Sequence, residues 1–283
     1  MFFLPAWLIF SLLTGILSNT FNFMSRFILR KGDDSTVFSW YFECFRFIIF
    51  ASLAFFDWRL VITPQSLLLL LLLGMSQFLS SYYYMKMHAN THLSISAILS
   101  RARMIWVPIL AFIFINERLF LLDYLGILIV FLGISITTAP KKLVFDKGAR
   151  YANLFAIFTA ANVIFIKLLL PIASDFVIIA AMSLPGTFLY PFLMRNAKQR
   201  IFTSFRTKFP LKVLAIAISI VAMFFLTTAL RLGDASKVNA IYQGMMILSV
   251  LAGIIFLHER KDIARKLIGT TITVIGVVLI SFS

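Results

Sequence analysis

The sequence contains a single cysteine, Cys44, and only three histidines. One cysteine excludes an internal disulfide framework and a metal site built from several cysteines. The histidines, His88, His92 and His258, have no carboxylate or cysteine at the spacing of a metal-ligand set. We therefore expect no bound metal and no cofactor, and we interpret the histidines as polar residues at the membrane interface.

Charged residues are also scarce, at 13% of the 283 residues, whereas 61% are hydrophobic. A soluble domain of this size needs far more polar surface to cover its core. Apolar runs of about 20 residues, long enough to cross a bilayer as a helix, recur along the chain. The sequence predicts an all-α membrane protein with ten transmembrane helices, at about 3–29, 35–57, 65–87, 91–115, 119–138, 151–170, 175–193, 211–230, 236–257 and 263–282.

Acidic residues are the rarer charge, with 11 Asp and Glu against 26 Lys and Arg and a net charge of +15. In so apolar a chain, this excess indicates basic loops beside anionic lipid and argues against a nucleic-acid partner. Lys and Arg gather in the loops after odd-numbered spans and are sparse after even-numbered spans. The loop charges therefore predict a multi-pass protein of the plasma membrane with both termini outside the cytoplasm.

A long apolar segment that ends in Glu-Arg and is followed by two glycines occurs twice, in 92–133 and in 236–276. The matching positions are Glu117-Arg118 with Glu259-Arg260, Gly126 with Gly269, and Gly133 with Gly276. Such self-similarity indicates an internal duplication. Glycines two turns apart on a membrane helix favour close contact with another helix.

A polar linker at 139–150 separates the two copies, so we assign 1–138 and 151–283 as two five-helix repeats. Because each repeat has an odd number of spans, the second must enter the membrane from the opposite side. The two repeats are therefore predicted to be inverted relative to each other.

These residues resemble the drug/metabolite transporter superfamily, specifically its EamA-type members. The resemblance covers nearly the whole chain and rests on Pro108, the turn at Asn116-Glu117-Arg118, and the repeated glycine pairs; the second copy departs from it at Val250, where a proline would stand. It implies a ten-helix transporter of the bacterial inner membrane, a monomer or homodimer that binds a small-molecule substrate within the lipid bilayer. It also implies both termini in the cytoplasm, against the loop charges, so the orientation stays open.

Polar residues deep in the predicted spans are the candidates for substrate binding, because a charge in hydrocarbon is costly unless it is paired or lines a wet cavity. Arg101 stands where the second copy has Gln243, at a depth where inverted-repeat transporters bind substrate. Asn239 lies four residues before Gln243, on the same helix face. The full predicted set is Arg101, Asn239, Gln243, Arg46, Glu43, Tyr242, Tyr83 and Trp40.

Several of these residues have an equally plain structural interpretation. Glu43 and Arg46, three residues apart, could form a buried structural pair. Arg103 points about 200° away from Arg101 on a helix and is interpreted as structural. Lys167 is expected to extend to the interface. The glutamates of the two Glu-Arg turns are expected to cap helices or to bond a neighbouring helix.

Arginines outnumber acids inside the spans, and a guanidinium binds carboxylates and phosphates well. We therefore expect a secondary carrier for an anionic or zwitterionic metabolite, such as an amino acid, a nucleotide-like solute or a phosphorylated or carboxylated solute. One alternative is a proton-coupled exporter of drugs or amines. The small multidrug exporters of the same superfamily use a glutamate in their first helix for proton exchange; span 3–29 contains no Asp or Glu, which argues against that mechanism, although Glu43 could substitute. Another is a structural or sensory membrane protein. An enzyme is not expected, because no nucleophile with a base and no H-E-x-x-H motif occurs.

Overall fold

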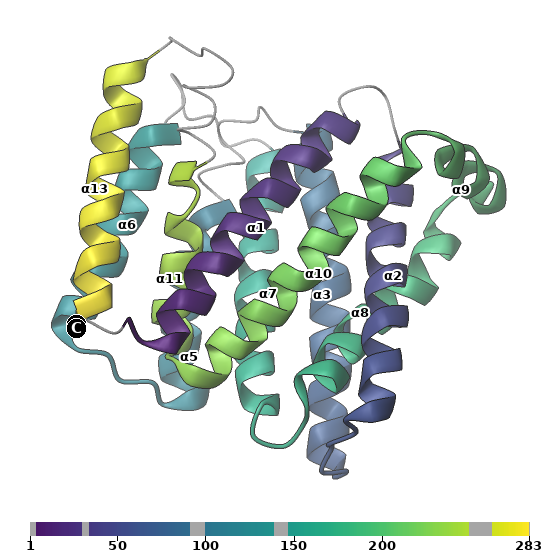
Figure 1. The fold of residues 1–283 in the computed structure, drawn as a ribbon, viewed down its shortest axis with the longest axis horizontal. Helices are drawn as coiled ribbons and strands as arrows, with labels where there is room; N and C mark the ends of the chain where they lie inside the picture. Colours follow the sequence, from purple (N-terminus) through teal and green to yellow (C-terminus); the bar gives the residue numbers. More distant parts are fainter. Residues whose placement is uncertain (1–3, 30–33, 91–99, 139–146, 249–261, 283) are drawn as a thin grey trace.

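The computed structural model describes residues 4–29, 34–90, 100–138, 147–248 and 262–282, and these are almost entirely helical (Figure 1). The helices are α1 (Ala6–Leu29), α2 (Ser35–Phe56), α3 (Pro64–Asn90), η1 (Ser100–Ala102), α5 (Arg103–Ile115), α6 (Leu121–Thr138), α7 (Lys147–Leu169), α8 (Asp175–Leu193), α9 (Ala197–Arg206), α10 (Phe209–Leu232), α11 (Ala235–Gly244) and α13 (Ile263–Phe282). The long helices form one bundle, and α9 lies at the opposite end of it from the C-terminal end of α13 (Figure 1).

Eight of the described helices are long and apolar enough to cross a membrane, namely α1, α2, α3, α6, α7, α8, α10 and α13. Each corresponds to one predicted span. The other two predicted spans, 91–115 and 236–257, are described only in part, by η1 with α5 and by α11. Residues 91–99 and 249–261 lie outside the described residues.

The end of α5 follows the sequence prediction. The helix contains Pro108 and stops at Ile115, and Asn116 then adopts a left-handed conformation with φ of 52°. The amide of Asn116 donates to the carbonyl of Ala111, which closes the last turn. The equivalent turn of the second copy, at 259–260, lies outside the described residues.

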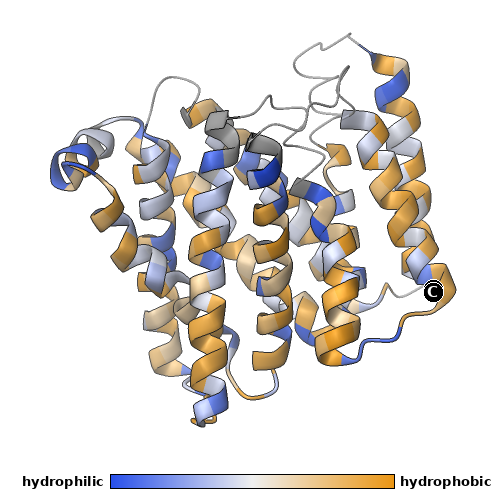
Figure 2. Ribbon diagram, turned by 180° about the vertical axis from the view of Figure 1, so that it is seen from behind, coloured by the Kyte–Doolittle hydropathy of each residue, from blue (hydrophilic) through white to orange (hydrophobic). Residues whose placement is uncertain are grey.

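The helices are built mostly of hydrophobic residues, with shorter hydrophilic stretches between them (Figure 2). Large side chains such as Phe112, Leu128 and Ile268 are 50% exposed or more. Ionisable side chains such as Glu43 and Arg46 are instead fully buried among the helices. This inversion of a soluble protein's pattern is expected where lipid replaces water, because hydrocarbon cannot solvate polar groups.

The most extensive helix contacts join a helix from before residue 139 to one from after residue 146. They pair α1 with α10, α2 with α8, α3 with α7, and α6 with α13. The α1–α10 pair is antiparallel, because Trp7, near the start of α1, packs on Gly233 after α10, whereas Lys208, before α10, donates to the carbonyl of Ile28 at 3.1 Å. Contacts along the other three pairs follow the same antiparallel order.

The two glycine pairs bring the backbones of α6 and α13 together. A Cβ atom on Gly269 would lie 2.6 Å from the carbonyl oxygen of Gly133, and one on Gly276 would lie 2.8 Å from the carbonyl oxygen of Gly126. These distances are too short for any side chain larger than hydrogen. The structure thus confirms that the repeated glycines allow close helix contact.

One helix was not anticipated. Helix α9 occupies a stretch that the sequence analysis treats as a basic loop, because ten residues, six of them polar or basic, are too few and too polar to carry a membrane signal. It is held to the bundle by an ion pair between Arg200 and Asp34, 2.6 Å apart. Burial opposes ionisation of Asp34, but hydrogen bonds from Arg200 and from the first amides of α2 outweigh it and hold the pKa of Asp34 below its usual value.

Replacing Gly269 with valine should destabilise the protein by about 1–3 kcal/mol, because α6 and α13 must move apart to admit the side chain. The measurement is the thermal unfolding midpoint of purified protein in detergent. Ile268→Val is the matched control, since Ile268 is 57% exposed on the same helix. Equal midpoints for the two variants would contradict the packing role of Gly269.

Candidate functional site

The first cluster of predicted site residues lies where η1 and α5 meet α11. The Arg101 guanidinium donates to the side-chain carbonyl of Gln243 at 3.1 Å. The Arg103 guanidinium donates to the Tyr242 hydroxyl at 3.3 Å and lies over the ring, 5.1 Å from its centroid. The residues predicted to occupy equivalent positions in the two copies, Arg101 and Gln243, are therefore in direct contact.

The two arginines do not diverge as the sequence analysis expects. Arg101 lies in the short 3₁₀ helix η1, and Arg103 is the first residue of α5. The continuous α-helix assumed over 91–115 is thus interrupted at this point, and both side chains reach α11. They contact adjacent residues of α11, so Arg103 belongs to the same cluster as Arg101.

The buried face of α11 carries a row of polar side chains. Ser236, Asn239 and Gln243, spaced by three and four residues, are each at most 2% exposed. No described residue forms a hydrogen bond with the amide nitrogen of Asn239 or of Gln243, or with the hydroxyl of Ser236. A buried donor without an acceptor costs about 1–3 kcal/mol, so this face is suited to a ligand that supplies acceptors.

A second cluster surrounds Glu43 on α2. Its carboxylate forms an ion pair with Arg46 and accepts hydrogen bonds from Gln77 at 3.0 Å and from Ser81 at 3.3 Å. The Arg46 guanidinium also donates to Ser183 of α8 at 2.5 Å. Glu43 and Arg46 therefore do form a buried pair, and its hydrogen bonds tie α2 to α3 and α8.

The second cluster extends into α7 through amides and hydroxyls. Asn162 donates to the Gln77 carbonyl oxygen at 2.9 Å and accepts from Ser76. Ser80 and Thr159 are hydrogen-bonded at 2.8 Å one turn away. The sequence analysis missed these residues because they are uncharged. The sequence feature that could have indicated them is an amide side chain, Gln77 or Asn162, within a long apolar run.

Two of the predicted aromatic residues, Trp40 and Tyr83, fall outside the first cluster. Trp40 donates from its indole nitrogen to the carbonyl of Thr187 at 2.9 Å, across the α2–α8 contact. Tyr83 stacks on Phe158 and Tyr151 of α7. Both residues therefore pack helices of the second cluster against each other.

Glu117 has a clear structural role. Its carboxylate accepts hydrogen bonds from the amides of Ala235 and Ser236, at 2.7 and 3.0 Å, and so caps the start of α11. This confirms the interpretation of Glu117 as a capping or interhelical group. Glu259 lies outside the described residues.

The Lys167 ammonium donates to the carbonyls of Leu230 and Gly233, both at 2.6 Å, at the end of α10. That it lies at the membrane interface stays a prediction. Nearby, Lys237 of α11 pairs with the fully buried Asp123 of α6 at 3.0 Å. The turn between α10 and α11 is thus held by Lys167 of α7, by Asp123 of α6 and by Glu117 of the loop after α5.

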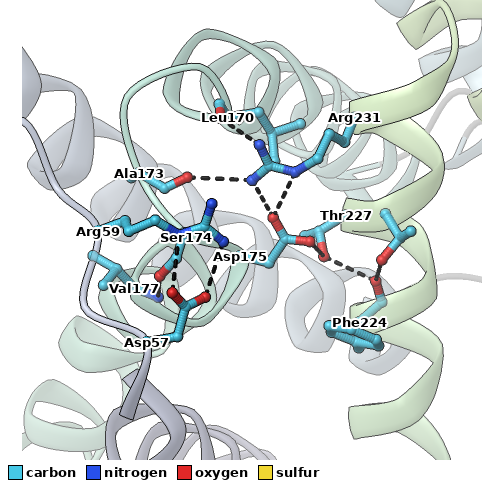
Figure 3. A network of polar contacts seen from close by, with 11 residues as sticks. Asp57, Arg59, Leu170, Ala173, Ser174, Asp175, Val177, Phe224, Thr227 and Arg231 are labelled. Carbon is cyan, nitrogen blue, oxygen red and sulfur yellow. Dashed lines mark hydrogen bonds and ion pairs between the residues drawn. The ribbon is translucent and has the colours of Figure 1, made fainter. Parts of the chain in front are cut away.

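A separate network joins the loops at the same end of the bundle as this turn (Figure 3). Arg231 of α10 pairs with Asp175 at the start of α8 and donates to the carbonyls of Leu170 and Ala173. The amide of Ser174 donates to the carbonyl of Arg59 at 2.7 Å. These contacts join the loop after α2 to the loop before α8. The charges of Asp57 and Arg59, and of Asp175 and Arg231, are paired within the network.

Among the described residues, no group of three His, Cys, Asp or Glu side chains gathers as metal ligands would. His92 and His258 lie outside the described residues. The clusters above therefore consist of guanidinium, amide, carboxylate and hydroxyl groups, which can bind an organic solute.

Comparison with known proteins identifies the class. The EamA-like transporter family matches the chain twice, over residues 5–139 and 146–282. The chain belongs to this family, and it is therefore a multi-pass membrane transporter and not an enzyme. One solved structure, described only as a crystal structure of a protein, covers 99% of both chains with a TM-score of 0.76 at 11% identity, which shows a shared fold. No curated protein matches the sequence.

Replacing Arg46 alone with methionine should cost about 3–5 kcal/mol of stability, because Glu43 would stay buried without its partner. The double variant Glu43→Gln/Arg46→Met should recover part of that loss, because no charge is left unpaired. Thermal unfolding of both variants in detergent measures the difference. A single variant as stable as the double variant would show that Arg46 does not neutralise Glu43.

Proposed function

We propose that the protein is a secondary carrier that moves a small anionic or zwitterionic organic metabolite by alternating access, with its binding site at Arg101, Asn239 and Gln243. The observation that carries the proposal is the contact between Arg101 and Gln243 beside a buried polar face with unpartnered donors. Such a face is costly without a ligand, and the ligand must bring acceptor oxygens to satisfy it.

The proposal takes the two repeats, 1–138 and 151–283, to be inverted. The antiparallel contact of α6 with α13, and of α2 with α8, supports this arrangement, since each pair consists of equivalent helices of the two copies. The reciprocal glycine contacts, Gly126 with Gly276 and Gly133 with Gly269, are those of a two-fold relation. A residue that touches its own equivalent lies on the axis of that relation, and Arg101 and Gln243 do so.

An axis that relates inverted repeats lies in the membrane plane. The Arg101 guanidinium is then near the middle of the bilayer, where it can be reached in turn from either side. Its planar set of donors suits a carboxylate or a phosphate. The amides of Asn239 and Gln243 add neutral donors, which fit a solute that also bears other polar groups.

The proton-coupled exporter is less well supported. Glu43 already accepts hydrogen bonds from Arg46, Gln77 and Ser81, so its carboxylate is occupied in contacts between α2 and α3 and within α2. We therefore propose that Glu43, Arg46, Trp40 and Tyr83 fix helices behind the substrate site, and that their effect on substrate is indirect.

For orientation, we propose that the basic end of the bundle, which holds α9, faces the cytoplasm. Both termini then lie outside. A reporter fused after Ser283 that is active only in the cytoplasm tests this, and a signal from it would support the family norm. The location of the protein in the plasma membrane and its monomeric or homodimeric state stay predictions.

Arg101→Ala should abolish transport while leaving folded protein in the membrane. The substrate is first identified by a thermal-shift screen of purified protein against amino acids, nucleotides and sugar phosphates, and its uptake into proteoliposomes is then measured. Arg118→Ala is the control, because Arg118 is exposed in the loop after α5. Uptake by Arg101→Ala at the rate of the control would remove Arg101 from the site.

A further inference from the structure

Helix α9 is placed at the membrane surface by its neighbours. It joins α8 to α10, and both are long enough to span a bilayer. Asn196 and Lys208, on either side of α9, have positive φ values of 56° and 48°, which turn the chain sharply into and out of the helix. Ten residues between two spans, with a turn at each end, lie along the surface and not across it.

The orientation of α9 about its own axis is fixed by contacts with the bundle. The Tyr41 hydroxyl of α2 donates to the carbonyl of Ile201 at 2.8 Å, and Arg200 pairs with Asp34. The Lys212 ammonium, 1% exposed, donates to the hydroxyl and carbonyl of Ser204, both at 2.8 Å. One face of α9 is therefore held against the bundle, and the opposite face is left uncovered by the described residues.

The outward side combines basic and apolar side chains. Arg195 and Lys198 are exposed, and neither forms an ion pair with any described residue. Close to them in the sequence, Phe192 is 84% exposed and Phe202 is 59% exposed. The whole segment 195–212 contains no Asp or Glu. Aromatic rings at this level enter the acyl boundary, while Lys and Arg reach the phosphates.

We infer that α9 is a docking surface for anionic phospholipid. Arg195 and Lys198 bind the headgroup phosphate, and Phe192 and Phe202 contact the acyl chains. The occupant is a lipid and not a free phosphate, because the exposed aromatic side chains flank the cationic ones. It is an anionic lipid, because two uncompensated positive charges gain little from a headgroup with no net charge.

The test is a titration of delipidated protein in detergent with dioleoyl-phosphatidylglycerol, followed by native mass spectrometry. Arg195→Gln/Lys198→Gln should weaken binding by about tenfold. The control Arg118→Gln/Arg150→Gln lowers the net charge equally without touching α9 and should bind as the unaltered protein does. Phe192→Ser/Phe202→Ser should also weaken the binding of phosphatidylglycerol. Inorganic phosphate should not compete with the lipid for the site.

Equal losses in the α9 variant and the control would overturn the proposal, since any positive charge would then serve. No loss in either would overturn it as well, as would equal binding of dioleoyl-phosphatidylcholine. A measurement on the unaltered protein does not depend on variants: its preference for phosphatidylglycerol should fall steeply at 1 M salt, where the screening length is about 3 Å. A preference that survives this salt concentration would contradict an electrostatic headgroup site.

Discussion

Hydrocarbon gives a polar side chain no water to bond, and this constraint decides where nearly every polar group of the protein lies. Glu43 finds Arg46, Gln77 and Ser81, and Asp123 finds Lys237. Helix ends obey the same constraint, since Glu117 satisfies the first amides of α11 and Lys167 the last carbonyls of α10. The buried face of α11 is an exception, because three of its side chains, Ser236, Asn239 and Gln243, have polar atoms with no hydrogen-bond partner among the described residues, and the substrate site is proposed there.

The sequence predicted the spans well because length and hydropathy decide them. It also predicted that α6 and α13 each make a close helix contact, since repeated glycines on membrane helices favour one, but it did not predict that they contact each other. It failed at α9, whose ten residues are too short and too polar to carry a membrane signal. It failed again at η1, because a local change from α to 3₁₀ geometry turns side chains without altering the apolar pattern.

For the site, alignment of the two copies was the useful signal. It placed Arg101 opposite Gln243, and the two side chains are hydrogen-bonded. Residues with no charge and no equivalent in the other copy, such as Asn162 and Ser183, could not be found in this way. The partners of Lys167 could not be predicted either, because the sequence does not reveal that the end of α10 lies beside it.

The position of Arg101 against its own equivalent bears on how the carrier responds to membrane voltage. In the carrier that we propose, the two inverted halves exchange conformations, and a group on the axis between them stays at the same depth. A fixed charge that does not move through the electric field does no electrical work, whereas a full crossing would involve about 2.3 kcal/mol per 100 mV. Any voltage dependence of transport then arises from the net charge of the solute and its co-transported ions, and not from this arginine.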